Sequence, residues 1–304
     1  MEKDRSHKEN SGQCWEYFQY QTIIPLQVSK RGLQEENPGD DTFQEIPEID
    51  AFGPWILEIC KKYPTPPLFL PYITEEIKQA QMLIKIPRNM DRKEAMKYRD
   101  LYDYVMGICS KRLIILERVN DQVREYSVSY PEVQGIQITR ELLVGKVLLY
   151  TEKGVFQIPY NTVSDDTIKR FVKLLREKSF AVDFPKVSEE LFGKNIDIQR
   201  LPHLFQTELM KMEDEKEDFF PLYYRQISRW EASSMPEWLL LVSRREVLIL
   251  LARELGGANG IHSTSRLHLP LSHLEESLVQ KFVTDEKLAA ACVEVYQKVL
   301  EASE

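Results

Sequence analysis

The feature that most constrains the fold of this chain is an internal repeat. Residues 109–116 read CSKRLIIL and residues 242–250 read VSRREVLIL, so a turn with serine and arginine opens an apolar run twice. A second apolar limb follows each run, EYSVSYPEVQGI in the first copy and RLHLPLSHLEES in the second. A strand, a turn and a strand that occur twice predict two related β-rich modules. In this alignment, the second copy carries one inserted residue at Glu246.

Composition limits the class of protein. The chain has 304 residues, which is enough for two domains of ordinary size. Its content of 43% hydrophobic and 29% charged residues is typical of a globular protein. The net charge of -8 argues against a nucleic-acid partner, because such binding depends on an excess of Lys and Arg.

Cysteine usage and the N-terminal residues indicate a cytoplasmic protein. Cys14, Cys60, Cys109 and Cys292 lie far apart, without a CxxC pair or a Cys/His cluster, so we expect neither a disulfide framework nor a metal site. The polar N-terminus is not a signal peptide, and no apolar run is long enough for a membrane span. No motif indicates a cofactor.

The first copy predicts seven short strands followed by one helix. Alternating apolar residues place strands at 82–86, 102–108, 113–118, 124–129, 133–139, 142–151 and 155–160. The period then changes from 2 to 3.6, with Ser164 as the N-cap and with Ile168, Phe171, Val172 and Leu175 on one face of a helix that extends to 178. Seven strands of this kind are expected to bend into a barrel or an orthogonal sandwich that the helix closes.

The second copy predicts fewer strands. We expect a short helix at 201–212, strands at 220–226, 237–242, 247–253, 265–269 and 274–281, and a final helix at 285–301. Its missing edge is expected to come from residues 14–24 or 49–60. The resulting division is a disordered tail (1–13), an N-terminal strap (14–81), a first module (82–180), a linker (181–200) and a degenerate second module (201–304).

At residues 109–175 the chain resembles bacterial proteins with a pleckstrin-homology-like (PH-like) fold. The segments that carry the resemblance are CSKRLIIL, EYSVSYPEVQGIQI, LLVGKVLLYTEKG and IPYNTVSDDTIKRFVKLL. The resemblance covers about a third of the chain and implies a fold without a chemistry. It implies a mainly β protein with two PH-like barrel or sandwich modules, each closed by a C-terminal helix, and with an extended N-terminal strap.

A basic loop is the first candidate site. In PH domains that bind phosphoinositides, basic residues at the end of strand one and the start of strand two surround the lipid phosphates, and Lys85, Lys97 and Arg99 match that spacing loosely, with Arg88 between them. The opposing interpretation is a solvated loop with weak local ion pairs.

The sequence contains three further candidate sites. His262, His268 and His273 lack carboxylates at ligand spacing, and His268 lies between Leu267 and Leu269, so surface histidines are expected. Cys109, Ser110 or Ser243 could act as a nucleophile, but no nucleophile elbow or phosphate loop accompanies them. The belt of aromatic residues and prolines is expected to be a strap, with a partner-binding patch as the alternative: Phe52, Trp55, Tyr63, Pro66, Pro67, Phe69 and Tyr72.

These observations favour a non-enzymatic cytoplasmic protein that acts in protein interaction or scaffolding. The alternative is peripheral binding of an anionic lipid or a phosphorylated ligand through the basic loop at 85–99. The third hypothesis is an enzyme with a dispersed active site.

Overall fold

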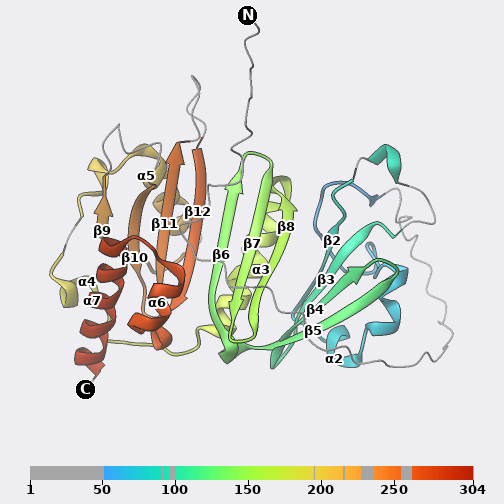
Figure 1. Cartoon of the computed structure of the whole chain (residues 1–304), viewed down its shortest axis with the longest axis horizontal. Helices are drawn as coiled ribbons and strands as arrows, with labels where there is room; N and C mark the ends of the chain where they lie inside the picture. Colours follow the sequence, from blue (N-terminus) through green and yellow to red (C-terminus); the bar gives the residue numbers. More distant parts are fainter. Residues whose placement is uncertain are drawn as a thin grey trace, which may run out of the picture.

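The fold is mainly β, with helices packed on two antiparallel sheets (Figure 1). The computed structural model describes residues 51–90, 92–95, 100–194, 196–214, 216–226, 236–254 and 262–303. The predicted tail (1–13) and the first part of the predicted strap lie outside these residues. No helix in the described part of the chain is long and apolar enough to cross a membrane.

The first sheet has five strands in the order β1-β2-β3-β4-β5. They are β1 (Leu57–Glu58), β2 (Met82–Pro87), β3 (Tyr102–Ile108), β4 (Arg112–Val119) and β5 (Gln122–Ser129). Each neighbour is antiparallel. The prediction of four strands between 82 and 129 is therefore confirmed, and β1 adds a short edge.

The second sheet has seven strands in the order β8-β7-β6-β12-β11-β10-β9. They are β6 (Val133–Glu141), β7 (Val144–Thr151), β8 (Gly154–Asn161), β9 (Phe220–Arg225), β10 (Glu237–Val242), β11 (Glu246–Glu254) and β12 (His262–Pro270). Strand β6 pairs with β12 from His268↔Ile136 to Thr264↔Arg140. The two halves of the chain are thus joined edge to edge through backbone hydrogen bonds.

The helices cover the faces of these sheets. They are α2 (Glu75–Lys78), α3 (Asp165–Ser179), α4 (Glu189–Phe192), α5 (His203–Asp214), α6 (Glu276–Phe282) and α7 (Glu286–Ser303). Single 3-10 turns lie at η1 (Pro67–Tyr72), η2 (Arg92–Glu94), η3 (Tyr130–Glu132), η4 (Thr162–Ser164), η5 (Ile198–Arg200) and η6 (Leu271–His273). In Figure 1, α6 and α7 lie in front of the seven-stranded sheet, and α3 and α5 lie behind it.

Most of both sheets is buried on both faces, although Gln157 and Pro159 on the outer face of β8 are exposed. One face of the five-stranded sheet packs with α3 and with β6–β8, and the other face packs against Phe52, Phe69 and Ile77 from the N-terminal segment. In the second half, α6 and α7 cover one face of β9–β12, while α5 covers the other. A residue that points away from one core therefore points into another.

The repeat continues beyond the residues that first revealed it. The N–H of Cys109 donates to the carbonyl of Arg112 at 3.0 Å, and the N–H of Ser243 donates to the carbonyl of Glu246 at 2.9 Å. Ser129 opposes Arg112 as Pro270 opposes Glu246, and a 3-10 turn follows in both copies. The two hairpin turns have equal length, so Glu246 is the first residue of β11 and the expected insertion at this position is wrong.

Four other expectations need correction. The sheets are open, so neither copy forms a closed barrel. Glu276–Phe282 form α6 where a strand was predicted at 274–281, because Leu278, Val279 and Phe282 bury one side of a helix. Of the segment 49–60, the described part extends the first sheet through β1 and does not complete the second half. The linker at 181–200 contains α4, whose Phe192 is buried.

Candidate functional site

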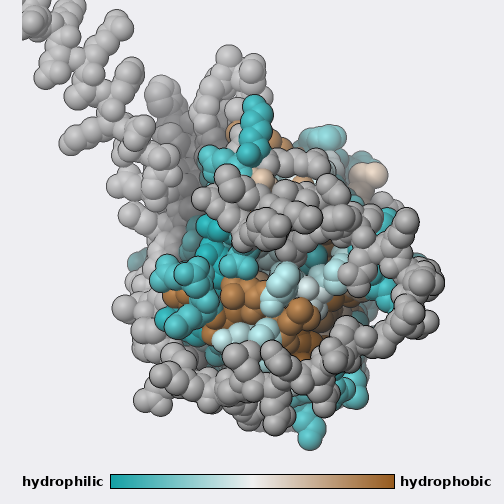
Figure 2. Space-filling view, turned by 90° about the vertical axis from the view of Figure 1, so that its right-hand side faces the viewer, coloured by the Kyte–Doolittle hydropathy of each residue, from teal (hydrophilic) through white to brown (hydrophobic). Residues whose placement is uncertain are grey.

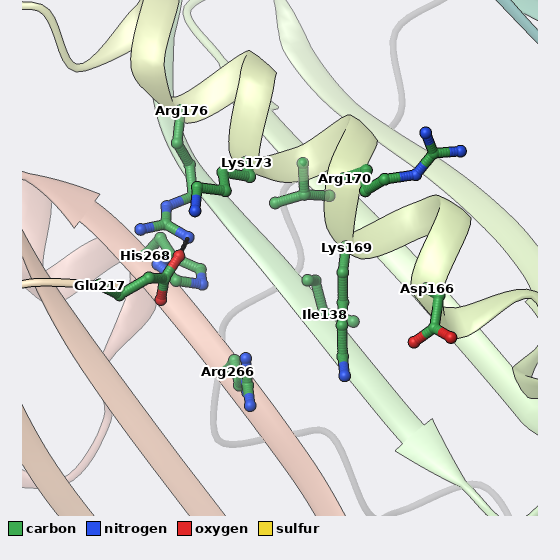
Figure 3. A pocket seen from close by; sticks show the side chains of 10 residues that line it. Ile138, Asp166, Lys169, Arg170, Lys173, Arg176, Glu217, Arg266 and His268 are labelled. Carbon is green, nitrogen blue, oxygen red and sulfur yellow. Dashed lines mark hydrogen bonds and ion pairs between the residues drawn. The ribbon is translucent and has the colours of Figure 1, made fainter. Parts of the chain in front are cut away.

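A charged groove lies beside α3, with β12 and β6 as its floor and with Glu217, which follows α5 in the chain, among its lining residues. Lys169, Lys173 and Arg176 recur at helical spacing on α3, on the side that faces the groove. On β12, Leu267 and Leu269 enter the core under α7, so Arg266 and His268 point to the groove side. The cavity measures about 260 Å³, and Figure 3 shows its lining side chains.

A buried ionic network forms one end of this groove. Arg176 of α3 contacts Glu246 of β11 through Nε (3.0 Å) and Nη2 (2.6 Å), and its Nη1 donates to Glu217 at 2.8 Å. His268 Nδ1 lies 2.9 Å from the second oxygen of Glu246. These four residues come from four separate segments, so the network fixes α3 of the first half onto the second half.

The environment of this network shifts its protonation. Burial alone would raise the pKa of the Glu246 carboxyl, but Arg176 and His268 outweigh burial and lower that pKa to about 2. Burial, together with Arg176, lowers the pKa of His268 from its ordinary value, although Glu246 favours the protonated form. His268 is therefore neutral at pH 7, and its contact with Glu246 identifies Nδ1 as the protonated nitrogen.

A second ion pair lies on the floor of the groove. Arg266 contacts one oxygen of Glu208, on α5, through Nε at 2.8 Å and Nη2 at 2.5 Å, and both side chains are buried. Lys211 binds the other oxygen of Glu208 at 2.9 Å. Burial would raise the pKa of Glu208, but Arg266 and Lys211 lower it to about 2.

An apolar hairpin tip is the second notable surface. Leu142 and Leu143 form the two-residue turn between β6 and β7, and they are 67% and 64% exposed. Val144 and Val163 beside them are also exposed, and we call these four residues the apolar tip. The turn is braced by Thr162, whose N–H and hydroxyl donate to the carbonyls of Leu143 and Leu142 at 3.0 and 2.9 Å.

The backbone of the apolar tip is unusual for its sequence. Leu142 has a φ of +53°, a region that favours Gly, Asn or Asp. The corresponding two-residue turn between β4 and β5 has Asn120 in this conformation, with Asp121 next to it. The apolar tip also borders a pocket of about 410 Å³ between the ends of β2, β3, β7 and β8, whose walls include Phe52, Ile86, Pro87, Leu143 and Pro159.

The basic residues expected to bind an anion are placed differently. Lys85 is 1% exposed, its Nζ donates to the carbonyl of Pro64 at 2.8 Å, and it lies over the ring of Tyr102. Arg88 donates to the carbonyl of Asp100 and lies 3.8 Å from Asp103. Lys97 and Arg99 lie outside the described residues. In this structure Lys85 therefore ties the N-terminal segment to the sheet and does not face solvent.

The structure also shows the positions of the candidate histidines and of Cys109. His268 is fully buried, so the expectation of a surface histidine is wrong for this residue, whereas His273 is exposed. The side chain of His262 lies outside the described residues. No group of His, Cys, Asp and Glu in the described ranges has the arrangement of a metal site. Cys109 is buried, and burial raises the pKa of its thiol to about 11.

The N-terminal belt is mostly structural in the part that is described. Phe52 and Phe69 are buried against the outer face of the five-stranded sheet, while Trp55 is 45% exposed. Figure 2 looks onto this end of the molecule, where hydrophobic residues are visible between hydrophilic ones. The belt therefore covers the sheet as a strap and leaves some apolar side chains at the surface.

The groove and the apolar tip were not identified from the sequence. The basic stripe Lys169, Lys173 and Arg176 was a signal for the groove, because i, i+4 and i+7 positions share one side of a helix. The carboxylate partners of Arg176 come from distant segments and have no local signal, whereas Lys169 pairs with Asp165 on the same helix. Comparisons with models of protein families, with curated proteins and with solved structures give no match for this chain.

Proposed function

We propose that this chain is a non-enzymatic, cytoplasmic PH-like protein that acts by binding another protein. The observation that carries the proposal is the apolar tip. A monomeric protein gains nothing from two exposed leucines at a hairpin turn, where Asn and Gly are the favourable residues. Exposure and a strained backbone at one position are typical of residues that serve a contact.

The PH-like classification is supported by the order of the elements. Strands β2–β5 form four antiparallel neighbours, β6–β8 form three more, and α3 packs between the two groups. The second half repeats the four strands as β9–β12 and ends in α7, which covers the same face of its sheet as α3 does in the first half. We therefore interpret the chain as two related modules, of which the second lacks the three additional strands.

The bordering pocket indicates how a partner would be held. The apolar tip provides a rigid projection, and the pocket beside it provides a recess with apolar walls and Arg88 at its rim. A partner with an apolar side chain could fill the recess while its neighbouring residues cover the tip. Buried apolar anchors of this kind supply most of the binding energy at protein interfaces.

The test compares the native tip with the turn sequence that the chain uses elsewhere. The double variant Leu142→Asn/Leu143→Asp copies the Asn-Asp turn between β4 and β5, and Met210→Asn removes an equally exposed apolar residue from α5. Affinity capture from native lysate should recover a protein with wild type and with Met210→Asn, but not with the double variant. A photo-crosslinker at position 143 should attach directly to that protein. Equal capture by all three forms would exclude the tip as the binding surface.

Co-sedimentation with vesicles separates protein binding from the lipid alternative. Lys85 is buried, so the appropriate variant of the basic loop is Lys97→Ala/Arg99→Ala. If wild type binds anionic vesicles at low salt and this variant does not, the lipid function should replace the protein-binding function. Absence of vesicle binding leaves the protein-binding proposal as it stands.

A further inference from the structure

The groove beside α3 has the composition of a ligand site, and nothing in the protein-binding proposal uses it. Five cationic side chains line it, three from the basic stripe of α3 together with Arg170 and Arg266, against the carboxylates of Asp166 and Glu217. Four of these cations have carboxylate partners, namely Lys169 with Asp165, Arg170 with Glu58, Arg176 with Glu217 and Glu246, and Arg266 with Glu208, so the groove is lined by cations that are also paired.

The cationic groups come from two elements that face each other. Figure 3 shows Lys169 extending from α3 towards the floor of the groove, with Arg266 on the floor between Lys169 and the pair Glu217 and His268. Arg266 contacts Glu208 through two of its N–H groups, on the α5 side. A guanidinium has five such donors in a planar fork, which suits the recognition of phosphate or carboxylate oxygens.

The opposite wall of the groove presents hydrogen-bond acceptors. The side chain of Glu217 is 7% exposed, and its Oε1 accepts from Arg176, whereas its Oε2 is buried without a hydrogen-bond partner among the described residues. A buried polar atom of this kind costs free energy unless a donor reaches it. Because Nδ1 of His268 donates to Glu246, its Nε2 is the second acceptor on this wall.

We propose that this groove binds a small phosphomonoester with a free hydroxyl group. The phosphate oxygens would face Lys169, Lys173 and Arg266, and a hydroxyl of the ligand would donate to Oε2 of Glu217. The ligand must carry both an anionic group and a donor, because the two walls offer opposite hydrogen-bonding groups. A cavity of about 260 Å³ has room for on the order of ten non-hydrogen atoms, at about 30 Å³ for each water-sized group.

The experiment titrates the full chain with glycerol 3-phosphate in low-salt buffer by isothermal calorimetry. This probe combines a phosphate monoester with two hydroxyls, and glycerol is the matched neutral probe. Wild type should bind glycerol 3-phosphate and not glycerol. Lys169→Ala/Lys173→Ala should weaken binding at least tenfold, while Lys186→Ala/Lys281→Ala, which removes the same charge from exposed positions outside the groove, should bind as wild type does.

A second variant tests the acceptor wall and leaves the lysines of α3 in place, although it removes the charge that Glu217 offers to Arg176. Glu217→Gln keeps an oxygen for Arg176 but can place an NH2 group where Oε2 lies. We expect the preference for glycerol 3-phosphate over inorganic phosphate to fall several-fold in this variant. An unchanged preference would overturn the assignment of the hydroxyl to Glu217.

The remaining comparisons test whether the groove binds phosphate at all and whether the ligand is a free phosphomonoester or a lipid. No binding by wild type at low salt, or equal binding by the two double-lysine variants, would overturn the groove as a phosphate site. Binding to phosphatidic acid vesicles that requires Lys169 and Lys173, without binding of glycerol 3-phosphate, would overturn the assignment to a free ligand. The apolar-tip variant Leu142→Asn/Leu143→Asp should bind glycerol 3-phosphate normally, so failure of one proposal leaves the other unaffected.

Discussion

At the scale of single residues, Lys85 and His268 are both buried, and for the same reason. Each lies in a strand between apolar neighbours and points away from them, as strand alternation requires. A side chain that points away from its apolar neighbours would be exposed if only one face of the sheet were covered. Here the N-terminal segment covers Lys85, and the Arg176 network covers His268, so both are about 1% exposed and hold polar partners.

The sequence could therefore predict the direction of these side chains but not their contacts. The partner of His268 is Glu246, the first residue of the neighbouring strand, and the partner of Lys85 is a backbone carbonyl 21 residues earlier. Neither spacing has a local pattern. The candidate site was missed for this reason, because the ion pairs of Arg176 and Arg266 join residues that are distant in the chain.

The protonation of the network predicts that stability falls at acidic pH in two steps. The pKa of folded His268 lies below its unfolded value of about 6.5, so its contribution is present above pH 6.5 and is lost as pH falls towards the folded pKa. The carboxyls of Glu246 and Glu208 have a folded pKa of about 2, so their contribution is present above about pH 4.5 and is lost between pH 4.5 and 2.

Melting temperatures of three proteins measure the histidine step. Wild type should become less stable between pH 7 and 5, and His268→Gln, which keeps a donor for Glu246, should show a smaller decrease over this range. His273→Gln removes an exposed histidine and should follow the wild-type profile. Parallel profiles for wild type and His268→Gln would contradict a depressed pKa for His268.

At the scale of elements, the periodicity of the sequence predicted most of the first half. The strands from β2 to β8 and the helix α3 lie where alternation and helical spacing placed them. The strand expected at 274–281 is an error, because Leu278, Val279 and Phe282 have helical spacing and bury one side of α6.

Both C-terminal helices should contribute to stability through their buried faces. Phe171 in α3 and Val295 in α7 are buried in separate clusters. Phe171→Ala should destabilise the protein by about 3–5 kcal/mol, and Val295→Ala should cost less because fewer atoms are removed. Denaturant midpoints measure both effects, with Glu177→Ala and Gln297→Ala as exposed controls on the same helices. Unchanged midpoints would show that these helices do not close the cores.

The junction between the two halves requires a glycine in β6. A Cβ at Gly135 would lie 2.9 Å from a methyl group of Leu269 and 3.4 Å from the carbonyl of His268, both in β12. Gly135→Ala should therefore cost about 1–3 kcal/mol, because the buried Leu269 side chain or the paired strands must shift. Amide hydrogen exchange should increase in β6 and β12 more than in β4 and β5. Equal exchange in all four strands would indicate that the junction tolerates the added methyl group.

At the scale of the whole molecule, three kinds of contact join the halves. Strands β6 and β12 are paired, Arg176 binds Glu246 and Glu217, and Tyr150 of β7 packs edge-on against Phe282 of α6 with ring centroids 4.7 Å apart. The cluster under α7 contains side chains from both halves. A continuous sheet with a shared core should unfold as one unit, although chains of this size often do not.

Single-tryptophan proteins test this cooperativity. A variant that retains only Trp238, which is buried in the second half, and a variant that retains only Trp55, in the first half, should give the same denaturation midpoint as far-UV circular dichroism. Arg176→Leu should lower the free energy of unfolding by about 3–5 kcal/mol and shift all midpoints together, because it leaves Glu246 and Glu217 buried without their cation. Arg170→Leu, an exposed arginine on the same helix, should change stability by less than about 0.5 kcal/mol. Separate midpoints for Trp55 and Trp238 in the otherwise native chain would show that the edge-to-edge junction connects two units that fold independently.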